Sequence, residues 1–359
     1  MNRRQFLLHA GLASGAGSLV LPGLAQGAAA AAAPQGLPVG APGKRRTLIL
    51  IELQGGNDGL NTLIPYADAH YARLRPNLAI PRTRVVQLDD KRGLHPALAG
   101  LLPIWRAHEL ALVEGVGYPE SNLSHFRSLD IWHTGSSASR YLRQGWLTRA
   151  LAMRSGISPA AAPERAVVFG SPDAGALARH RPVHAVADAP GTLPEDSFRH
   201  AVQASLRLLA ATSAGNPAPA VIKLTLTGFD THENQAVQHA LALQRLSDGL
   251  VALRDGLRRQ DAWQDTLVMT YSEFGRHPAE NGAHGTDHGT AAAQLLMGGR
   301  VRGGFLGGAM RLDRLDGAGN PVPTVDFRAV YSSVLTQWWA TDPRGVLGGR
   351  FASLPLIRI

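Results

Sequence analysis

The sequence contains no cysteine among its 359 residues. This absence excludes disulfide bonds, thiolate nucleophiles and cysteine-ligated metal sites. A folded protein of this kind must be held together by its hydrophobic core. Hydrophobic residues make up 45% of the chain and charged residues 18%, which is typical of a globular protein and not of a disordered one.

Lysine is also scarce, and Lys44, Lys91 and Lys223 are the only three. The formal net charge of +9 therefore comes almost entirely from arginine, and subtracting Arg3 and Arg4 leaves +7. These arginines are scattered singly along the chain, with no basic helix face and no aromatic platform beside them. The sequence therefore predicts no nucleic-acid partner, only a mild preference for anions.

Long apolar runs are missing too. The N-terminus instead carries Arg3-Arg4 followed by Phe6 and Leu7, then a weakly apolar run over 10–24 and small residues over 28–33. A membrane span needs about 20 strongly apolar residues, and this run is shorter and broken by glycines and Pro22. The pattern is typical of a twin-arginine export signal with a cleavage site. An amphipathic helix or a membrane anchor is the structural alternative.

We therefore expect a signal peptide over 1–33, a proline-rich linker over 34–46, and a single domain over 47–359. Export by this route implies the twin-arginine translocase as a partner and a periplasmic or secreted location. No segment after the signal is long and apolar enough to span a bilayer, so the cleaved protein should have no stable membrane span.

The remaining chain alternates strand and helix patterns. Continuous apolar runs predict buried strands over 47–53, 110–116, 166–169, 221–226, 266–271 and 293–297. Helical spacing predicts helices over 96–107, 124–133, 235–260 and 327–339, and the segment 155–200 is loop-like. This alternation indicates an α/β fold with a mainly parallel sheet.

Polar clusters follow four of the predicted strands, where ligands bind in open parallel sheets. The candidate residues are Asp58, Ser121, Ser124, Asp230, His232, Glu273, His284, Asp287 and His288. Carboxylate oxygens and imidazole nitrogens from separate strands are typical ligands of a divalent metal such as zinc, magnesium, manganese or calcium. The clusters therefore predict a metal or anion site at this edge.

Each cluster has a simpler interpretation when it is taken alone. Asn57-Asp58-Gly59 is also an ordinary turn sequence, and Asp230 could cap the helix that follows it. The segment 281–289 is more specific, because it places three titratable groups within five residues among glycines. Four such clusters at strand ends favour a site over turns.

Several long motifs resemble one family of uncharacterised bacterial proteins, mostly exported by the twin-arginine route and described as a domain of unknown function. The motifs are GGNDGLNTLIP (55–65), LSHFRSLDIWHTG (123–135), GW (145–146), GFDTHENQ (228–235), SEFGR (272–276), NGAHGTDHG (281–289) and VDFR (325–328). The likeness runs from about Arg46 to the C-terminus and is weakest in the middle. That family in turn resembles the alkaline phosphatase and sulfatase superfamily.

This resemblance implies a three-layer α/β/α sandwich, alkaline-phosphatase-like, with a metal centre at the carboxyl edge of the sheet and activity on phosphate or sulfate esters. It places a metal-binding carboxylate on Asp58 and the nucleophile on Ser124, with Ser121 as a rival. The remaining metal ligands fall on Asp230, His232, Glu273, the pair Asp287-His288, and His284 as an alternative to His288.

Two departures from the superfamily pattern stand out. Asp230 and His232 are closer in sequence than the corresponding pair usually is, and Glu273-Phe274 stands where an Asp-His pair is expected. A one-metal or altered centre is therefore an alternative to a two-metal one.

The predicted function is hydrolysis of a small anionic ester. Metal polarisation would activate the ester and Ser124 would attack it, while Arg127 or Arg276 would hold the anionic oxygens. The alternative is a non-catalytic exported protein that keeps a degenerate metal site for binding or assembly.

Overall fold

The computed structural model describes residues 46–155, 166–170, 173–178, 184–186, 197–212 and 218–358. The predicted signal peptide over 1–33 and the linker up to residue 45 lie outside the described residues. Much of the segment 155–200, predicted to be loop-like, also lies outside them.

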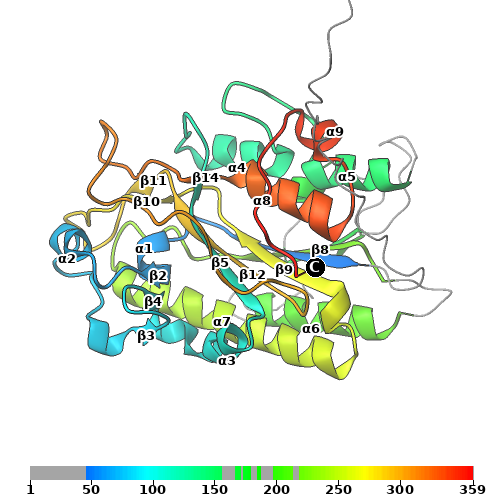
Figure 1. The fold of residues 1–359 in the computed structure, drawn as a ribbon, viewed down its shortest axis with the longest axis horizontal. Coiled ribbons are helices and arrows are strands. Elements are labelled where there is room, and N and C mark those ends of the chain that lie inside the picture. Colours follow the sequence, from blue (N-terminus) through cyan, green and yellow to red (C-terminus); the bar gives the residue numbers. More distant parts are fainter. Residues whose placement is uncertain are drawn as a thin grey trace, which may run out of the picture. The chain divides into compact units, whose positions relative to one another are not determined.

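A nine-stranded sheet organises the described chain (Figure 1). Its strand order is β13-β5-β12-β9-β1-β8-β6-β7, and β14 pairs with β5. The strands are β1 (Thr47–Leu53), β5 (Leu110–Gly117), β6 (Ala166–Phe169), β7 (His184–Val186), β8 (Val221–Leu226), β9 (Thr266–Tyr271), β12 (Ala292–Met297), β13 (Gly304–Gly307) and β14 (Val325–Asp326). All pairings are parallel except those of β12, which runs antiparallel to both β5 and β9.

Helices cover both faces of this sheet (Figure 1). One face packs against α4 (His125–Thr134), α5 (Trp146–Ser155), α8 (Phe327–Ser333) and α9 (Pro343–Leu347). The other packs against α3 (Leu102–Arg106), α6 (Ser197–Ala210) and α7 (Gln235–Arg259). Because the central strands are buried on both sides, their sequences are continuous apolar runs. The predicted three-layer α/β/α sandwich with a mainly parallel sheet is confirmed.

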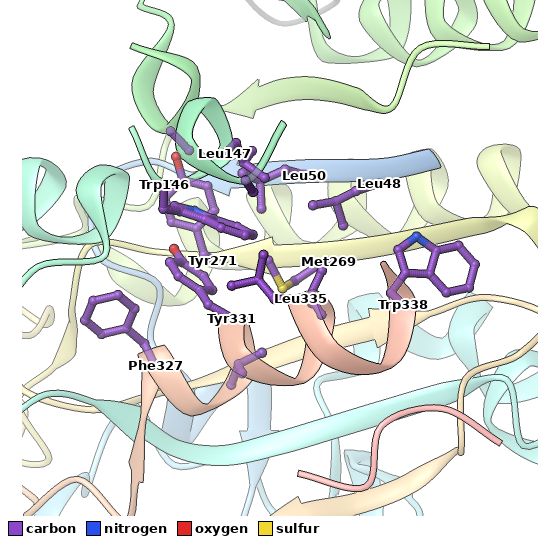
Figure 2. Close-up of a cluster of buried hydrophobic side chains, with 14 of the residues drawn as sticks. Leu48, Leu50, Trp146, Leu147, Met269, Tyr271, Phe327, Tyr331, Leu335 and Trp338 are labelled. Carbon is purple, nitrogen blue, oxygen red and sulfur yellow. The ribbon is translucent and has the colours of Figure 1, made fainter. Parts of the chain in front are cut away.

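Alternate residues of β1 enter the two apolar cores, as the period of a strand requires. Leu48 and Leu50 belong to the core under α4 and α8, whereas Ile49 and Ile51 belong to the core over α7. Aromatic stacking dominates the first core (Figure 2): the rings of Trp146 and Tyr331 lie 4.2 Å apart with an interplanar angle of 19°.

Smaller elements complete the first part of the chain. They are α1 (Gly59–Thr62), α2 (Ala69–Leu74), the three-stranded sheet of β2 (Leu63–Ile64), β3 (Val86–Gln87) and β4 (Gly93–Leu94), and the 3-10 turns η1 (Arg82–Arg84) and η2 (Pro96–Leu101). Later come η3 (Gly175–Leu177), η4 (Trp263–Asp265), the β10 (Gly275–Arg276) and β11 (His288–Gly289) pair, and the π-helical turn η5 (Val334–Trp338). No helix among the described residues has the length and apolar character of a membrane span.

Three differences from the expected elements stand out. Residues 197–210 form an unpredicted helix that begins at the end of the segment predicted to be loop-like, with Phe198, Ala201 and Val202 packed into the core. The predicted helix over 327–339 passes into a π-helical turn after Ser333, and α9 follows it. The strand at 292–297 is present but antiparallel, a direction that apolar periodicity cannot reveal.

Candidate metal centre

Asp230 is the centre of the polar cluster at the carboxyl edge of the sheet. It lies four residues after β8 ends, and its side chain is 50% exposed. Three imidazoles surround it, from α4, from the next turn of its own loop and from β11. Nε2 of His232 and Nε2 of His288 lie 3.1 and 3.3 Å from its Oδ1, and Nε2 of His125 lies 3.5 Å from its Oδ2.

Each of these imidazoles has its Nδ1 next to an acceptor. His125 Nδ1 lies 2.7 Å from Glu273 Oε1, and His288 Nδ1 lies 2.8 Å from the carbonyl oxygen of Leu123. His232 Nδ1 lies 3.5 Å from Asp287 Oδ1. An acceptor at Nδ1 favours a proton on that nitrogen, which is the tautomer that offers Nε2 to a cation. All three Nε2 atoms face the carboxylate of Asp230.

This donor set suits a divalent cation. One atom each from His125, Asp230 and His288 lies within 4.8 Å of the others, and Nε2 of His232 lies 3.0 Å from Nε2 of His288. Mixed imidazole and carboxylate donors favour zinc and related transition metals, and an acceptor behind each ligating histidine is the usual outer shell of such sites. The residues fit the predicted metal.

The surroundings shift the pKa values of two of these groups, Asp230 and His288, in the direction that metal binding needs. Burial alone would raise the pKa of Asp230, but the hydrogen bond and charge of Arg276, followed by the contact with His288, lower it below its ordinary value. Burial lowers the pKa of His288. The hydrogen bond to Glu273, by contrast, raises the pKa of His125, so a proton there competes with a cation.

Arg276 is hydrogen-bonded to three of the loops at this edge of the sheet. Its guanidinium is buried and donates to carbonyl oxygens of Gly55, Gly56, Phe229 and Thr286, and also to Asp230 Oδ1 at 2.7 Å. These partners engage most of its N–H donors, and the contact with Asp230 orients that carboxylate. Its role as an anion clamp stays a prediction.

Close backbone approaches explain two of the glycines in the motifs. Gly55 has a φ of +121°, and a Cβ there would lie 2.3 Å from the backbone nitrogen of Asp230. A Cβ on Gly285 would lie 2.2 Å from the backbone carbonyl of His232. A side chain at either position would push apart loops that carry the cluster.

The structure brings together five of the predicted metal-ligating residues, namely Asp230, His232, Glu273, Asp287 and His288. Glu273 lies behind His125. Its carboxylate contacts Nδ1 of that imidazole and also accepts from the backbone N–H of Gly55. His284 is exposed with a φ of +58°, and its backbone carbonyl accepts from Gln235. Among the described contacts its imidazole is not part of the cluster.

Asp58 is placed differently from the prediction. Its carboxylate is 1% exposed, pairs with both terminal nitrogens of Arg75, accepts from Gln235 and caps α1. Burial would raise its pKa, but the charge and hydrogen bonds of Arg75 lower it. Because these partners occupy both carboxylate oxygens, we leave Asp58 out of the proposed metal ligands. The turn interpretation of Asn57-Asp58-Gly59 describes it better.

Ser124 is the N-cap residue of α4, is exposed, and its hydroxyl does not cap the helix. It stands between Leu123, which contacts His288, and His125, which contacts Asp230. Ser121, its rival, donates to the carbonyl of Tyr118. Arg127 pairs with Asp130 and donates to the carbonyls of residues 138 and 140, so it holds the loop after α4.

His125 is the residue that sequence reasoning missed. It lies inside the motif LSHFRSLD, directly after the predicted nucleophile. The sequence did indicate it in one way. His125 is the first residue of a helix that follows a strand-end loop, and such positions lie at the edge of a parallel sheet where ligands bind. No spacing rule relates it to Glu273, 148 residues later.

Comparison with known proteins agrees with the resemblance seen in the sequence. Residues 183–336 match a family described as "Protein of unknown function (DUF1501)". The motifs at 228–235, 272–276, 281–289 and 325–328 lie within this match. No curated protein matches the chain.

The chain is also similar to solved structures of the alkaline phosphatase and sulfatase kind. A 2-O GAG sulfatase has 8% identity and a TM-score of 0.42, over 72% of this chain and 66% of that one. An alkaline phosphatase superfamily protein from Vibrio parahaemolyticus has 12% identity and a TM-score of 0.39, over 73% and 62%. The C-terminal periplasmic domain of EcEptC from Escherichia coli, in complex with Zn, has 9% identity and a TM-score of 0.40, over 71% and 74%. The chain thus spans about two thirds of the length of the sulfatase.

Proposed function

We propose that this protein is an exported metal-dependent hydrolase of small phosphate or sulfate esters. The observation that carries the proposal is the convergence of three imidazole nitrogens on one half-exposed carboxylate at the carboxyl edge of the sheet. Asp230, His232, His288 and His125 would hold the cation, and Glu273 and Asp287 would orient two of the histidines from behind.

A bound divalent cation would supply Lewis-acid polarisation of a phosphoryl or sulfuryl oxygen. Ser124 is the nucleophile that the geometry favours, because its exposed hydroxyl stands at the N-terminus of α4 between two residues that contact the cluster. Partial positive charge at a helix N-terminus favours the anionic form of such a group. The exposure of Asp230 and His232 leaves the cluster open to a small substrate.

Metal content is the direct test of the site. We expect the purified protein, dialysed against zinc and then against metal-free buffer, to retain about one equivalent of metal by mass spectrometry. Asp230→Asn should lose it, because the carboxylate at the centre of the cluster is then neutral. Asp313→Asn removes a carboxylate from an exposed surface pair and is the matched control that should retain it. A metal-free wild-type protein contradicts the proposal.

Activity separates the hydrolase from the alternative function. Chromogenic phosphate monoesters, phosphate diesters and sulfate esters should be cleaved by the metal-loaded protein and not by Ser124→Ala.

The alternative, a binding or assembly protein with a degenerate site, is favoured by one observation. The two arginines expected to clamp the anion are both held by backbone carbonyls. Stoichiometric metal without cleavage of any ester class would establish that alternative.

Export is proposed from the N-terminal sequence. The pair Arg3-Arg4 followed by Phe6 and Leu7 is the feature that the twin-arginine translocase recognises. Replacing both arginines by lysine should retain the protein in the cytoplasm with its first 33 residues uncleaved. Periplasmic recovery of that variant in processed form would contradict this part of the proposal.

A further inference from the structure

Gln235, the first residue of α7, is fully buried behind the cluster. Its side-chain oxygen accepts hydrogen bonds from the hydroxyls of Thr231, at 3.1 Å, and Thr286, at 2.6 Å. Its side-chain nitrogen donates to Asp58. One amide therefore contacts three separate strand-end loops.

The two threonines lie directly beside the proposed metal ligands. Thr231 stands between Asp230 and His232 in the chain, and Thr286 immediately precedes Asp287 and His288. The backbone N–H of Thr286 also donates to the carbonyl of Thr231, at 3.2 Å. A carbonyl oxygen has two lone pairs, and two hydroxyl donors use both. This oxygen thus joins the two ligand-bearing loops, in addition to their backbone hydrogen bond and the contacts of Arg276.

The other end of the Gln235 amide is anchored to a buried ion pair. Asp58 and Arg75 are 1% and 0% exposed, and the guanidinium of Arg75 contacts both oxygens of the carboxylate. Arg75 also donates to the carbonyls of His277 and Pro278, which precede the loop at 281–289. The carboxylate of Asp58 only accepts hydrogen bonds, so it must face the side-chain nitrogen of Gln235 and not the oxygen. This fixes the orientation of the amide.

We infer that Gln235 is a positioning residue for the metal centre. The buried Asp58–Arg75 ion pair fixes the side chain of Gln235, and Gln235 in turn holds the two loops that carry the ligands. The inference rests on the proposed metal site. In this arrangement Asp58 does not contact the cation. It holds Gln235, which positions the residues that do. Outer partners of this kind typically contribute 10–100-fold to metal affinity.

The test variant is Gln235→Glu, which keeps the shape and the acceptor but removes the donor to Asp58. We expect zinc affinity, measured by competition with a chromogenic chelator, to fall about 10–100-fold, and the visible spectrum of the cobalt-loaded protein to change. Gln238→Glu makes the same substitution one turn later on the exposed face of α7 and should change neither the zinc affinity nor the spectrum.

In the double variant Asp58→Asn, Gln235→Glu, donor and acceptor are exchanged. The hydrogen bond can then re-form, and we expect most of the lost affinity to return.

Thr286→Val provides an independent variant if Gln235→Glu does not fold, because it removes one hydroxyl donor and keeps the shape of the side chain. We expect it to weaken zinc binding several-fold and to retain its circular dichroism spectrum. Unchanged affinity in the folded Gln235 variant, or in Thr286→Val, would overturn the inference. Absence of zinc binding in the wild-type protein would instead contradict the metal site itself.

Discussion

At the scale of single residues, the candidate centre depends on the acceptor behind each imidazole. Glu273 faces His125, the carbonyl of Leu123 faces His288, and Asp287 faces His232. These acceptors come from three different segments, and each turns a ring so that its Nε2 points at Asp230. The strongest is Glu273, because its carboxylate is fully buried and lies 2.7 Å from the imidazole.

This geometry predicts the titration of His125. The hydrogen bond to Glu273 raises the pKa of His125, because the carboxylate stabilises the protonated ring. Glu273→Gln removes that charge, so the pKa of His125 should fall towards its ordinary value in the metal-free protein. Titration by nuclear magnetic resonance measures it directly. Glu280→Gln, which alters a carboxylate bound to residues 77 and 78, should leave the titration of His125 unchanged. An unchanged pKa in Glu273→Gln would refute the assigned contact.

At the scale of elements, α5 and α8 are joined by an aromatic stack over the sheet (Figure 2). Trp146 and Tyr331 are both completely buried and lie 4.2 Å apart. Tyr331 also donates to the carbonyl of Trp132 in α4. This layer fixes α4, which carries Ser124 and His125 at its N-terminus.

Trp146→Ala should lower the free energy of unfolding by about 3–5 kcal/mol, because it leaves a large cavity in the aromatic layer. Denaturant unfolding followed by circular dichroism measures the change. Phe126→Ala is the matched control, since that ring is 89% exposed on α4 and its loss should change stability by less than about 0.5 kcal/mol. A Trp146→Ala protein as stable as the control would show that the stack is dispensable.

A buried ion pair links two central strands and α4. Lys223 Nζ in β8 lies 2.6 Å from Glu52 Oε2 in β1, and His133 Nε2 lies 3.4 Å from Glu52 Oε1. Burial would raise the pKa of Glu52, but the hydrogen bonds and charges of His133 and Lys223 outweigh it and lower the pKa to about 2. The carboxylate therefore stabilises the fold above its unfolded pKa, and this contribution is lost as the pH falls from about 4.5 towards 2.

The stability difference between the wild type and Glu52→Gln should therefore shrink on acidification. A pKa lowered from 4.5 to about 2 corresponds to about 3 kcal/mol at pH 7, of which about 2 kcal/mol is lost by pH 3. Urea unfolding at several pH values gives this difference. Glu233→Gln, which replaces an exposed carboxylate, should show no comparable change. A constant difference between wild type and Glu52→Gln would mean that Glu52 is not held ionised by its neighbours.

At the scale of the whole molecule, metal binding and folding should be coupled. The proposed ligands come from α4, from the loop after β8 and from β11, so the cluster exists only in the folded chain. A cation that binds only the folded state stabilises it by about 2.7 kcal/mol at 100 times its dissociation constant.

Zinc at that concentration should raise the Tm by about 4 °C for a domain of roughly 310 residues. Differential scanning calorimetry with and without a chelator measures the shift, and excess chelator should reverse it. Asp230→Asn should show no zinc-dependent shift, which separates the cluster from adventitious binding elsewhere. A shift of the same size in this variant would place the stabilising cation at another site.

The local pattern of the sequence determined much of this architecture. Runs such as Thr47–Leu53 and Val221–Leu226 are apolar on both faces, so they must be central strands, and the polar clusters after them must lie at one edge. Asp230, His232 and His288 were predictable for that reason. The helix at 197–210 was not, because the segments on either side of it are rich in proline, glycine and alanine.

Which carboxylate contacts which partner was decided only by the tertiary structure. Asp58 and Asp230 each follow a buried strand, by five and four residues, and this spacing does not reveal their different partners. Arg75 and Gln235, distant in sequence, occupy Asp58, whereas three imidazoles surround Asp230. His125 and Glu273 meet across 148 residues for the same reason. Periodicity reports which way a side chain faces, but the partner it meets depends on how the loops pack in space.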